Sequence, residues 1–186
     1  MLWEQPGAQN TKATLELALQ RAEELGIKNI VVASCSGATA RELLALAKGI
    51  DLVCVTHHTG FDKPGENEMD AQTRQELEQA GVRVLTTTHV LAGVDRAVRN
   101  QFGGVYPAEI IAQTLRMLGQ GVKVATEIAV MALDAGMIPY GEEIISIGGT
   151  IQGADAAIVV KPAHANRFFD TEIREIICMP KTKKKS

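Results

Sequence analysis

The sequence predicts an α/β fold with a largely parallel sheet. Short β-branched runs at residues 29–33, 51–56 and 82–86 alternate with segments of helical periodicity, a pattern typical of βαβ units with right-handed crossovers. Only 4% of the residues are aromatic, so we expect an aliphatic core, the usual filling between helices and a parallel sheet. At 186 residues the chain has the length of one domain, shorter than a (β/α)₈ barrel of roughly 250 residues.

Three helices are expected in the first half of the chain. Residues 11–26 carry apolar side chains at helical spacing and end at Gly26, a typical C-cap. A second helix, over residues 39–48, follows the first strand, and a third reaches Gly81 after a polar loop at residues 57–67. Because a helix connects each strand to the next, these strands are expected to be parallel.

The second half contains a more apolar helix and a hairpin. Pro107 favours the start of a helix that continues to residue 118, and residues 122–135 are apolar on nearly every side, which predicts a buried helix. Residues 143–147 and 156–160 have the composition of strands. The link between them is too short for a helical crossover, so one of the two is expected to be antiparallel. Residues 172–178 are a candidate edge strand.

Two acidic residues lie inside the apolar helix. Glu127 follows Lys123 by four residues, a spacing at which the two side chains can form an ion pair. Glu127 and Asp134 share one face of the helix but are separated by about 10 Å along its axis. We therefore favour the Lys123–Glu127 pair over joint acid/base catalysis by the two carboxylates.

The charge distribution separates residues 1–180, expected to form a single domain, from a short basic end. Four lysines lie within residues 181–186, so the rest of the chain is more acidic than the net charge of −3 indicates. An acidic body disfavours binding to nucleic acid, which requires clustered Lys and Arg. Residues 181–186 are expected to be a disordered tail.

The cysteines and the N-terminus indicate a cytoplasmic protein. Cys35, Cys54 and Cys178 are odd in number and far apart, which is typical of reduced thiols. The N-terminal residues lack the pattern of a signal peptide, and no apolar stretch approaches the length of about 18 residues that spans a membrane. We expect no membrane partner, and a homo-oligomer is compatible with the sequence.

Small and hydroxyl-bearing residues follow four of the predicted strands. In an open α/β sheet ligands bind beyond the carboxyl ends of the strands, where hydroxyls donate to phosphate oxygens and a helix N-terminus offers free N–H groups. The residues at these positions are Ser34, Ser36, Gly37, Ala38 and Thr39, then Thr56, His57, His58 and Gly60, then Thr87, Thr88 and His89, and finally Gly148, Gly149 and Thr150. They predict a site for a phosphorylated small molecule. The chain contains neither a dinucleotide-binding fingerprint nor a P-loop motif.

These residues also have structural alternatives. Residues 39–42 match the S/T-x-x-E capping box, and Gly37 could serve only a tight turn at the surface. His57 and His58 are adjacent, so on an extended chain they point to opposite sides and do not readily bind one ion. Because Cys or carboxylate companions at useful spacing are lacking, no metal site is predicted. His57, His58 and His89 remain candidates for hydrogen bonding to a ligand or for acid/base catalysis.

Several long segments resemble one protein family. The turn at residues 36–40 and the Gly-rich loop at residues 148–154 resemble parts of the C-terminal α/β domain of pyruvate kinase. A closer resemblance, over nearly the whole chain, is to the stand-alone family of that domain found in archaea and bacteria. It rests on PGAQNT (residues 6–11), VTHHTGFDKPGE (55–66), FGGVYPAEIIAQTLRMLGQGVKV (102–124), EIAVMALDAGMIP (127–139) and IGGTIQGADAAIVVKPAHA (147–165).

The resemblance implies a three-layer α/β/α sandwich with a mixed sheet of about five strands in the order 3-2-1-4-5, the fifth antiparallel. It also implies that Ser34, Ser36, Gly37 and Thr39 hold a phosphate, because the corresponding turn of many pyruvate kinases holds a phosphate of a sugar-bisphosphate effector. For the stand-alone family the implied ligand is of the flavin mononucleotide (FMN) type. Pyruvate kinases often carry a basic residue where this chain has Ala38, which disfavours a bisphosphate.

Three functions are therefore open. The first is that of a flavoprotein that binds FMN, with the phosphate on residues 34–39 and the planar part against residues 56–60, 86–89 and 148–150. The second is an enzyme that acts on or with such a ligand and uses His57, His58 or His89 as acid or base. The third is a regulatory or assembly module that binds another protein. Pyruvate kinase activity is not expected in any of them, because the resemblance is to the regulatory domain.

Overall fold

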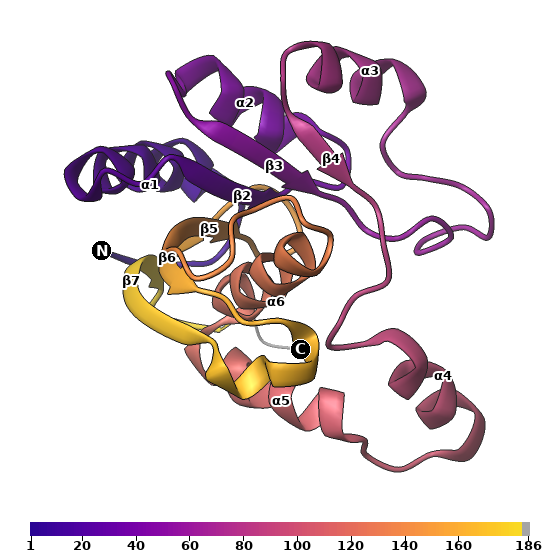
Figure 1. Cartoon of the computed structure of the whole chain (residues 1–186). Helices are drawn as coiled ribbons and strands as arrows, with labels where there is room; N and C mark the ends of the chain where they lie inside the picture. Colours follow the sequence, from indigo (N-terminus) through magenta and orange to yellow (C-terminus); the bar gives the residue numbers. More distant parts are fainter. Residues whose placement is uncertain (184–186) are drawn as a thin grey trace.

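The computed structural model describes residues 1–183, and at its centre lies a seven-stranded mixed sheet (Figure 1). The strands are β1 (Leu2–Trp3), β2 (Asn29–Ala33), β3 (Asp51–Val55), β4 (Arg83–Leu85), β5 (Ile144–Gly148), β6 (Ala156–Lys161) and β7 (Glu172–Pro180). Their order across the sheet is β1-β7-β6-β5-β2-β3-β4. Strands β5, β2, β3 and β4 are parallel, whereas β6 is antiparallel to both β5 and β7.

The expected order of five strands is confirmed for β2 to β6, including the antiparallel β6 at the end of the hairpin. The sheet has seven strands rather than five because β7 pairs with β6 and β1 pairs in parallel with the end of β7. β7 corresponds to the candidate edge strand, but β1 lies outside it and takes the edge. With two residues, β1 is too short to show a periodic pattern in the sequence.

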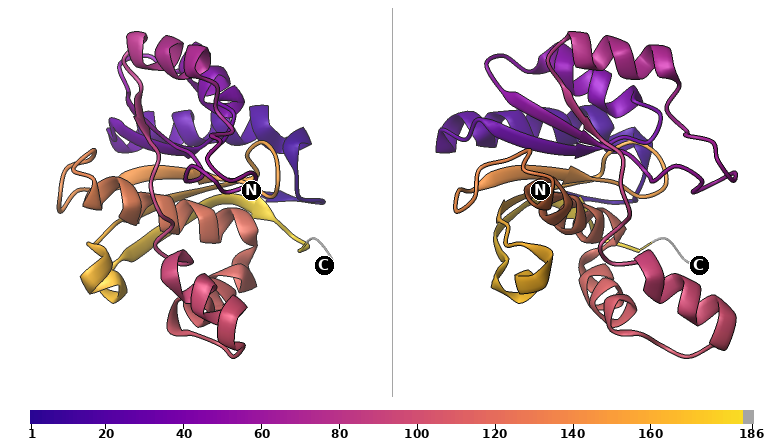
Figure 2. Two further views of the ribbon diagram at one scale, coloured as in Figure 1. Left: turned by 90° about the vertical axis from the view of Figure 1, so that its right-hand side faces the viewer. Right: turned by 45° about the vertical axis from the view of Figure 1, so that its right-hand side comes forward.

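Helices cover both faces of the sheet and complete the expected three layers (Figures 1 and 2). On one face lie α1 (Thr11–Leu25), α2 (Ala38–Leu46) and α3 (Ala71–Gln79), and on the other α6 (Gln120–Asp134). Because successive strand residues point to opposite faces, Ile30 and Val32 pack with α1 and α2, whereas Val31 packs with α6. The result is two aliphatic cores, one on each face of the sheet.

Glycines end α1 and begin α2. Gly26 adopts φ +68° and caps α1 as predicted. Gly37, at φ +87°, is the N-cap of α2, so Thr39 already lies inside the first turn and the capping box expected at residues 39–42 is wrong. Gly37 was expected at the surface but is buried against α3. A Cβ built on Gly37 would lie only 2.5 Å from Cγ2 of Thr73.

The helix α6 is buried along nearly its whole length. Lys123 Nζ and Glu127 Oε2 form the predicted ion pair, with side chains 7% and 4% exposed. The other oxygen, Oε1, accepts a hydrogen bond of 2.8 Å from the Leu91 N–H. Asp134 instead accepts a hydrogen bond of 2.8 Å from Nδ1 of His164. The two carboxylates of α6 therefore serve separate contacts.

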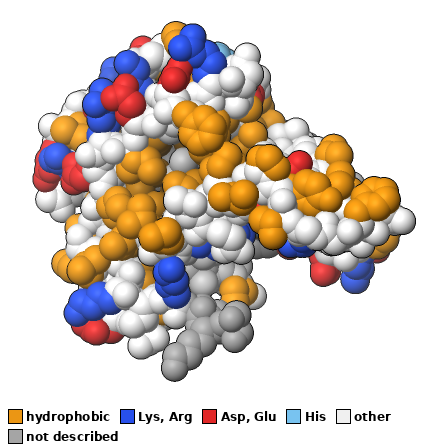
Figure 3. Space-filling view, turned by 90° about the horizontal axis from the view of Figure 1, so that it is seen from below, with side chains coloured by type: hydrophobic (Ala, Val, Ile, Leu, Met, Phe, Trp, Pro, Cys, Tyr) orange, Lys and Arg blue, Asp and Glu red, His pale blue; other side chains and the backbone are white. Residues whose placement is uncertain are grey.

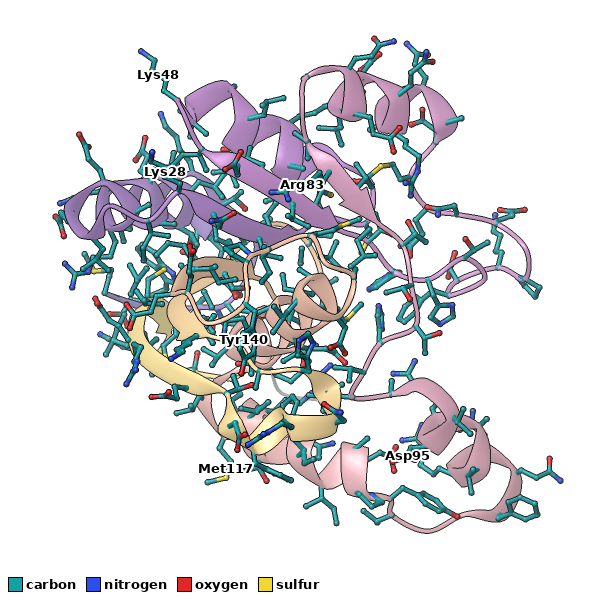
Figure 4. All side chains as sticks on the ribbon, viewed as in Figure 1. Lys28, Lys48, Arg83, Asp95, Met117 and Tyr140 are labelled. Atoms are coloured by element: carbon teal, nitrogen blue, oxygen red, sulfur yellow. The ribbon has the colours of Figure 1, made fainter. Side chains whose placement is uncertain are left out.

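The sequence did not predict α4 (Gly93–Phe102), which with α5 (Pro107–Leu115) forms a hairpin that projects from the body (Figure 1). The carboxylate of Asp95, labelled in Figure 4, accepts a hydrogen bond of 3.0 Å from the Ala108 N–H, and Arg99 pairs with Glu109 at 2.6 Å. These contacts hold the two helices together. Apolar side chains are exposed along this projection, as Figure 3 shows. On the hairpin they include Val94, Phe102, Val105 and Ile110, and two more, Met117 and Leu118, follow directly after α5.

The two ends of the chain meet at β1. The Lys181 N–H donates to the Trp3 carbonyl oxygen at 2.8 Å, and the Thr182 hydroxyl donates to the Glu4 carbonyl oxygen at 3.2 Å. These two residues of the expected tail are thus bonded to the N-terminal segment, while residues 184–186 lie outside the described part. All three cysteines are described and unpaired. Within residues 1–183, no helix has the length and apolar character to cross a membrane.

Candidate functional site

The carboxyl ends of β2, β3 and β4 bring three of the predicted groups of residues together. The Ser34 N–H donates to the Val55 carbonyl oxygen at 3.0 Å, and the Thr56 N–H donates to the Leu85 carbonyl oxygen at 2.9 Å. These bonds extend the parallel pairing past the strand ends and place the following turns side by side. We call the surface formed by residues 34–39, 56–61 and 86–89 the rim.

The turn after β2 leaves donors free at the start of α2. The Ser34 hydroxyl accepts a hydrogen bond of 3.3 Å from the Ala40 N–H. Within residues 1–183, no hydrogen bond reaches the N–H groups of Ala38 and Thr39, the first two residues of the helix. Ser36 and Ala38 are exposed. Free donors at the positive end of a helix dipole are suited to an anion.

The hydroxyls of Thr56 and Thr86 are already bonded within the protein. Thr56 donates to the His57 carbonyl oxygen at 2.7 Å, and its oxygen lies 2.7 Å from that of Thr86. Since Thr56 has one proton to give, Thr86 donates to Thr56 and in turn accepts from Arg74. Thr56 is 2% exposed. Thr56 was predicted to contact the ligand; in the structure its hydroxyl joins the ends of β3 and β4.

Aromatic side chains gather beyond β3 and β4. His57 stacks on Phe61 with ring centroids 3.7 Å apart and planes inclined by 21°. The centroid of His89 lies 5.3 Å from that of His57 and 5.7 Å from that of His58. The Arg96 guanidinium of α4 lies 5.8 Å from the Phe61 centroid. We call His57, His58, Phe61 and His89 the aromatic cluster.

A hydrogen bond sets the orientation of His58, and burial sets the charge of His89. His58 Nδ1 lies 2.8 Å from the Thr59 carbonyl oxygen, which can only accept, so Nδ1 donates. The pKa of His89 is lowered to about 4, mainly by burial, which Glu127 opposes and the neighbouring His57 reinforces. His89 is therefore neutral at pH 7 and suited to a hydrogen-bonding role rather than to that of a general acid.

Three potential metal ligands meet beside the rim. The Cys35 sulfur, a ring nitrogen of His57 and a carboxylate oxygen of Glu68 all lie within 4.8 Å of one another. The distance from His57 Nδ1 to Glu68 Oε2 is 2.5 Å. Burial raises the pKa of Cys35 to about 11, so it is a thiol at neutral pH. No metal site was predicted because the sequence shows no Cys or carboxylate at a useful spacing from the histidines. In the folded chain, Cys35 and Glu68 both lie beside His57.

The fourth predicted group, residues 148–150, packs within the fold. A Cβ at Gly148 would collide with the Gly121 carbonyl oxygen of α6, and one at Gly149 with the Gly153 carbonyl oxygen. These glycines therefore permit close backbone packing. Thr150 lines an open hollow of about 420 Å³ together with residues at the start of α6 and in the C-terminal segment.

Sequence reasoning missed four residues at or beside the rim: Phe61, Glu68, Arg96 and Cys35, the last of which was predicted only to be a reduced thiol. The only signal for Phe61 was an aromatic residue within a polar loop, where no strand or helix would bury it. Arg96 belongs to the helix that was not predicted, and Glu68 had no distinguishing signal. Thr87 and Thr88, which were predicted, are exposed at the rim.

Comparison with known proteins gives one family. Residues 12–160 match the family described as "Pyruvate kinase, alpha/beta domain". Similar solved structures include two of pyruvate kinase from Cryptosporidium parvum, one in complex with ADP. For each, the sequence identity is 15%, the TM-score is 0.42, and the match covers 83% of this chain and 23% of that chain. This chain thus spans less than a quarter of the length of those pyruvate kinases. Since the family match covers most of the sequence, the chain belongs to the pyruvate kinase alpha/beta domain family.

Proposed function

We propose that the rim binds a phosphorylated planar molecule of the FMN type. The observation that carries the proposal is the pair of free N–H groups of Ala38 and Thr39 at the start of α2, next to the turn that bears the aromatic cluster. An anion-binding helix end beside flat side chains is complementary to a ligand with one phosphate and one ring system.

The phosphate group lies at the N-terminus of α2 in this proposal. It accepts hydrogen bonds from the two free N–H groups and from the hydroxyl of Ser36, which is exposed. Ala38 adds no positive charge to the turn. The turn therefore suits one phosphate better than a bisphosphate, whose second charged group would need a further cation.

The planar part lies against the turns that follow β3 and β4. His57 and His58 are partly exposed and offer ring faces or edges for stacking, while Thr87 and Thr88 are exposed and offer hydroxyls to the polar edge of a ring system. Arg96 places a positive charge over Phe61 at the border of this surface. A neutral His89 can accept or donate one hydrogen bond without a change of charge.

Calorimetry with three ligands on ligand-stripped protein tests the proposal. FMN should bind more tightly than riboflavin by about 1.5–3 kcal/mol, or roughly 10- to 150-fold, because only FMN makes charge-assisted bonds to the helix end. It should also bind more tightly than fructose 1,6-bisphosphate. Equal affinity for FMN and riboflavin would remove the phosphate site, and a preference for the bisphosphate would favour an effector-binding regulatory domain.

A matched pair of variants at Ala38 tests the phosphate position. Ala38→Glu adds a negative charge to the first turn of α2, where the helix dipole favours it, so the fold should keep its stability. The same charge repels a phosphate, so the preference for FMN over riboflavin should disappear. Ala38→Gln, which is similar in size and neutral, should keep that preference. If both variants bind FMN as the wild type does, the phosphate lies elsewhere.

A regulatory or assembly module is the second candidate, favoured by membership of the family and by the exposed apolar residues of the α4–α5 hairpin. Such a module binds a protein whether or not FMN is present.

An enzyme that uses His57, His58 or His89 as acid or base is the third candidate. It would be established by turnover of the bound ligand with a pH dependence that substitution of one of these histidines abolishes.

A further inference from the structure

We propose that Cys35, His57 and Glu68 form a binding site for a divalent transition-metal ion of the zinc type. The three residues come from two segments of the chain: Cys35 from the turn after β2, and His57 and Glu68 from the beginning and the end of the loop between β3 and α3. Their donor atoms lie within 4.8 Å of one another. The proposal does not depend on the FMN-type ligand.

The distances are close to those of a tetrahedral site. Bonds of about 2.0–2.3 Å from zinc to nitrogen, oxygen and sulfur place neighbouring donor atoms roughly 3.3–3.6 Å apart. The His57–Glu68 pair, at 2.5 Å, is closer than this, and every other separation of the three donors is at most 4.8 Å. Each separation therefore differs from a tetrahedral value by less than about 1.5 Å, a distance on the scale of small side-chain rotations.

The donor set selects the class of ion. Sulfur and imidazole nitrogen favour a borderline-soft ion such as Zn²⁺ over Mg²⁺ and Ca²⁺, which prefer oxygen ligands. On binding, the S–H bond of Cys35 breaks, its proton passes to solvent, and the sulfur bonds to the metal. The imidazole of His57 remains neutral. The thiolate and the Glu68 carboxylate then balance the two positive charges of the ion.

Neighbouring groups orient these ligands before any ion arrives. The His57 ring is held by its stacking on Phe61 and by its contact with Glu68, and the His57 backbone N–H lowers the pKa of Cys35 against the larger effect of burial. Groups that fix the orientation of a ligand side chain increase metal affinity. The His57 and Glu68 side chains are 33% and 36% exposed, so a fourth position is open to water or to an oxygen atom of a molecule at the rim.

Metal titration of the full, untagged chain tests the proposal in the absence of FMN. After treatment with a chelator and removal of small molecules, calorimetry with Zn²⁺ should give one ion per chain, and Mg²⁺ should give no comparable heat. Replacement by Co²⁺ should produce a thiolate-to-metal charge-transfer band in the near ultraviolet. Wild-type protein that binds no Zn²⁺ would overturn the proposal, whatever the outcome with FMN.

Two variants test the ligands, and a third is their control. Cys35→Ser should remove the charge-transfer band. Glu68→Gln should weaken Zn²⁺ binding by at least about 100-fold, because loss of a residue that only orients a ligand already weakens metal binding by up to about 100-fold. Glu66→Gln is the matched control, because Glu66 lies in the same loop and, within residues 1–183, the one ion pair of its side chain is with Lys63, at 3.8 Å. Circular dichroism checks the fold, and if Cys35→Ser fails to fold, the two glutamate variants decide. Equal affinity for Zn²⁺ in Glu68→Gln and Glu66→Gln would refute the site.

Discussion

Replacing Glu127 by Gln should strongly destabilise the protein, because it leaves the Lys123 cation without its partner inside the fold. The Lys123 side chain is 7% exposed and forms its ion pair with Glu127 Oε2. The substituted amide keeps an oxygen that can accept the hydrogen bond from the Leu91 N–H, now 2.8 Å long. The change therefore removes the charge while it preserves the shape of the side chain and its link to the segment that carries His89.

The expected magnitude follows from the burial of both groups. Removing one partner of a buried ion pair typically costs about 3–5 kcal/mol, because the remaining charge is neither solvated nor paired. A domain of this kind has a total stability of about 5–15 kcal/mol. Lys123→Met should cost a similar amount, since the Glu127 carboxylate, 4% exposed, would keep only the Leu91 N–H. The double variant Lys123→Met with Glu127→Gln buries no charge and should recover most of the loss.

Denaturant unfolding followed by circular dichroism measures the four members of this double-mutant cycle. Burial lowers the pKa of Lys123 below the ordinary value of 10.5. The unfolded chain therefore binds more protons than the folded one between the two pKa values, and stability rises with pH in that window. In Glu127→Gln the lysine pKa falls further, so the deficit should shrink as the pH approaches 10.5. Single losses below about 1 kcal/mol, or a double variant as unstable as the sum of the singles, would refute the reasoning.

Three further predictions concern the rim and the projecting hairpin. Gly37→Val should lower the free energy of unfolding by about 2–4 kcal/mol, because the new side chain meets Thr73 Cγ2 at 2.5 Å and φ is +87°; wild-type stability would contradict the buried position. His58→Asn should change FMN affinity by about 1 kcal/mol in calorimetry, and loss of bound Zn²⁺ in this variant would contradict the choice of metal ligands. We expect the chain to self-associate through the exposed apolar residues of the hairpin. Phe102→Glu combined with Val105→Glu should therefore lower the mass measured by sedimentation. A wild-type chain that is monomeric at every concentration tested would argue against this interface.

The sequence predicts the sheet well where strands are long, buried and separated by periodic helices. The runs that became β2, β3 and β5 have few polar residues, because helices cover both faces of them. It fails for β1, which exists only because β7 offers it a partner, a contact between opposite ends of the chain. It also fails for α4, since none of its residues is buried and no core-facing stripe needed to be apolar.

The candidate site is predictable only as far as strand ends are. Parallel strands bring their carboxyl ends to one edge, so the groups after β2, β3 and β4 could be placed together from the sequence alone. The contacts between individual side chains at that edge could not be predicted. Cys35 lies beside His57 and Glu68 because of the path of a long loop, and no periodic sequence pattern constrains that path. The role of Thr56 was missed for a related reason, since its hydroxyl partner Thr86 belongs to the neighbouring strand end.

The topology also indicates in which direction a ligand held at the start of α2 would extend. The connection after β2 leads to β3 on one side of it, and the chain later returns to β5 on the other side. The strand order therefore reverses between β2 and β5. Ligands of such sheets commonly bind at that point. Beyond β5, however, the Gly-rich loop is occupied by the N-terminal segment, because the Ala154 N–H donates to the Thr11 hydroxyl at 3.0 Å and a Cβ at Gly153 would collide with that hydroxyl. On the β3 and β4 side, the rings of His57 and His58 remain partly exposed. We therefore expect the planar part of a ligand held at the start of α2 to extend toward β3 and β4, next to the proposed metal ligands, where one of its oxygen atoms would complete the coordination of the ion.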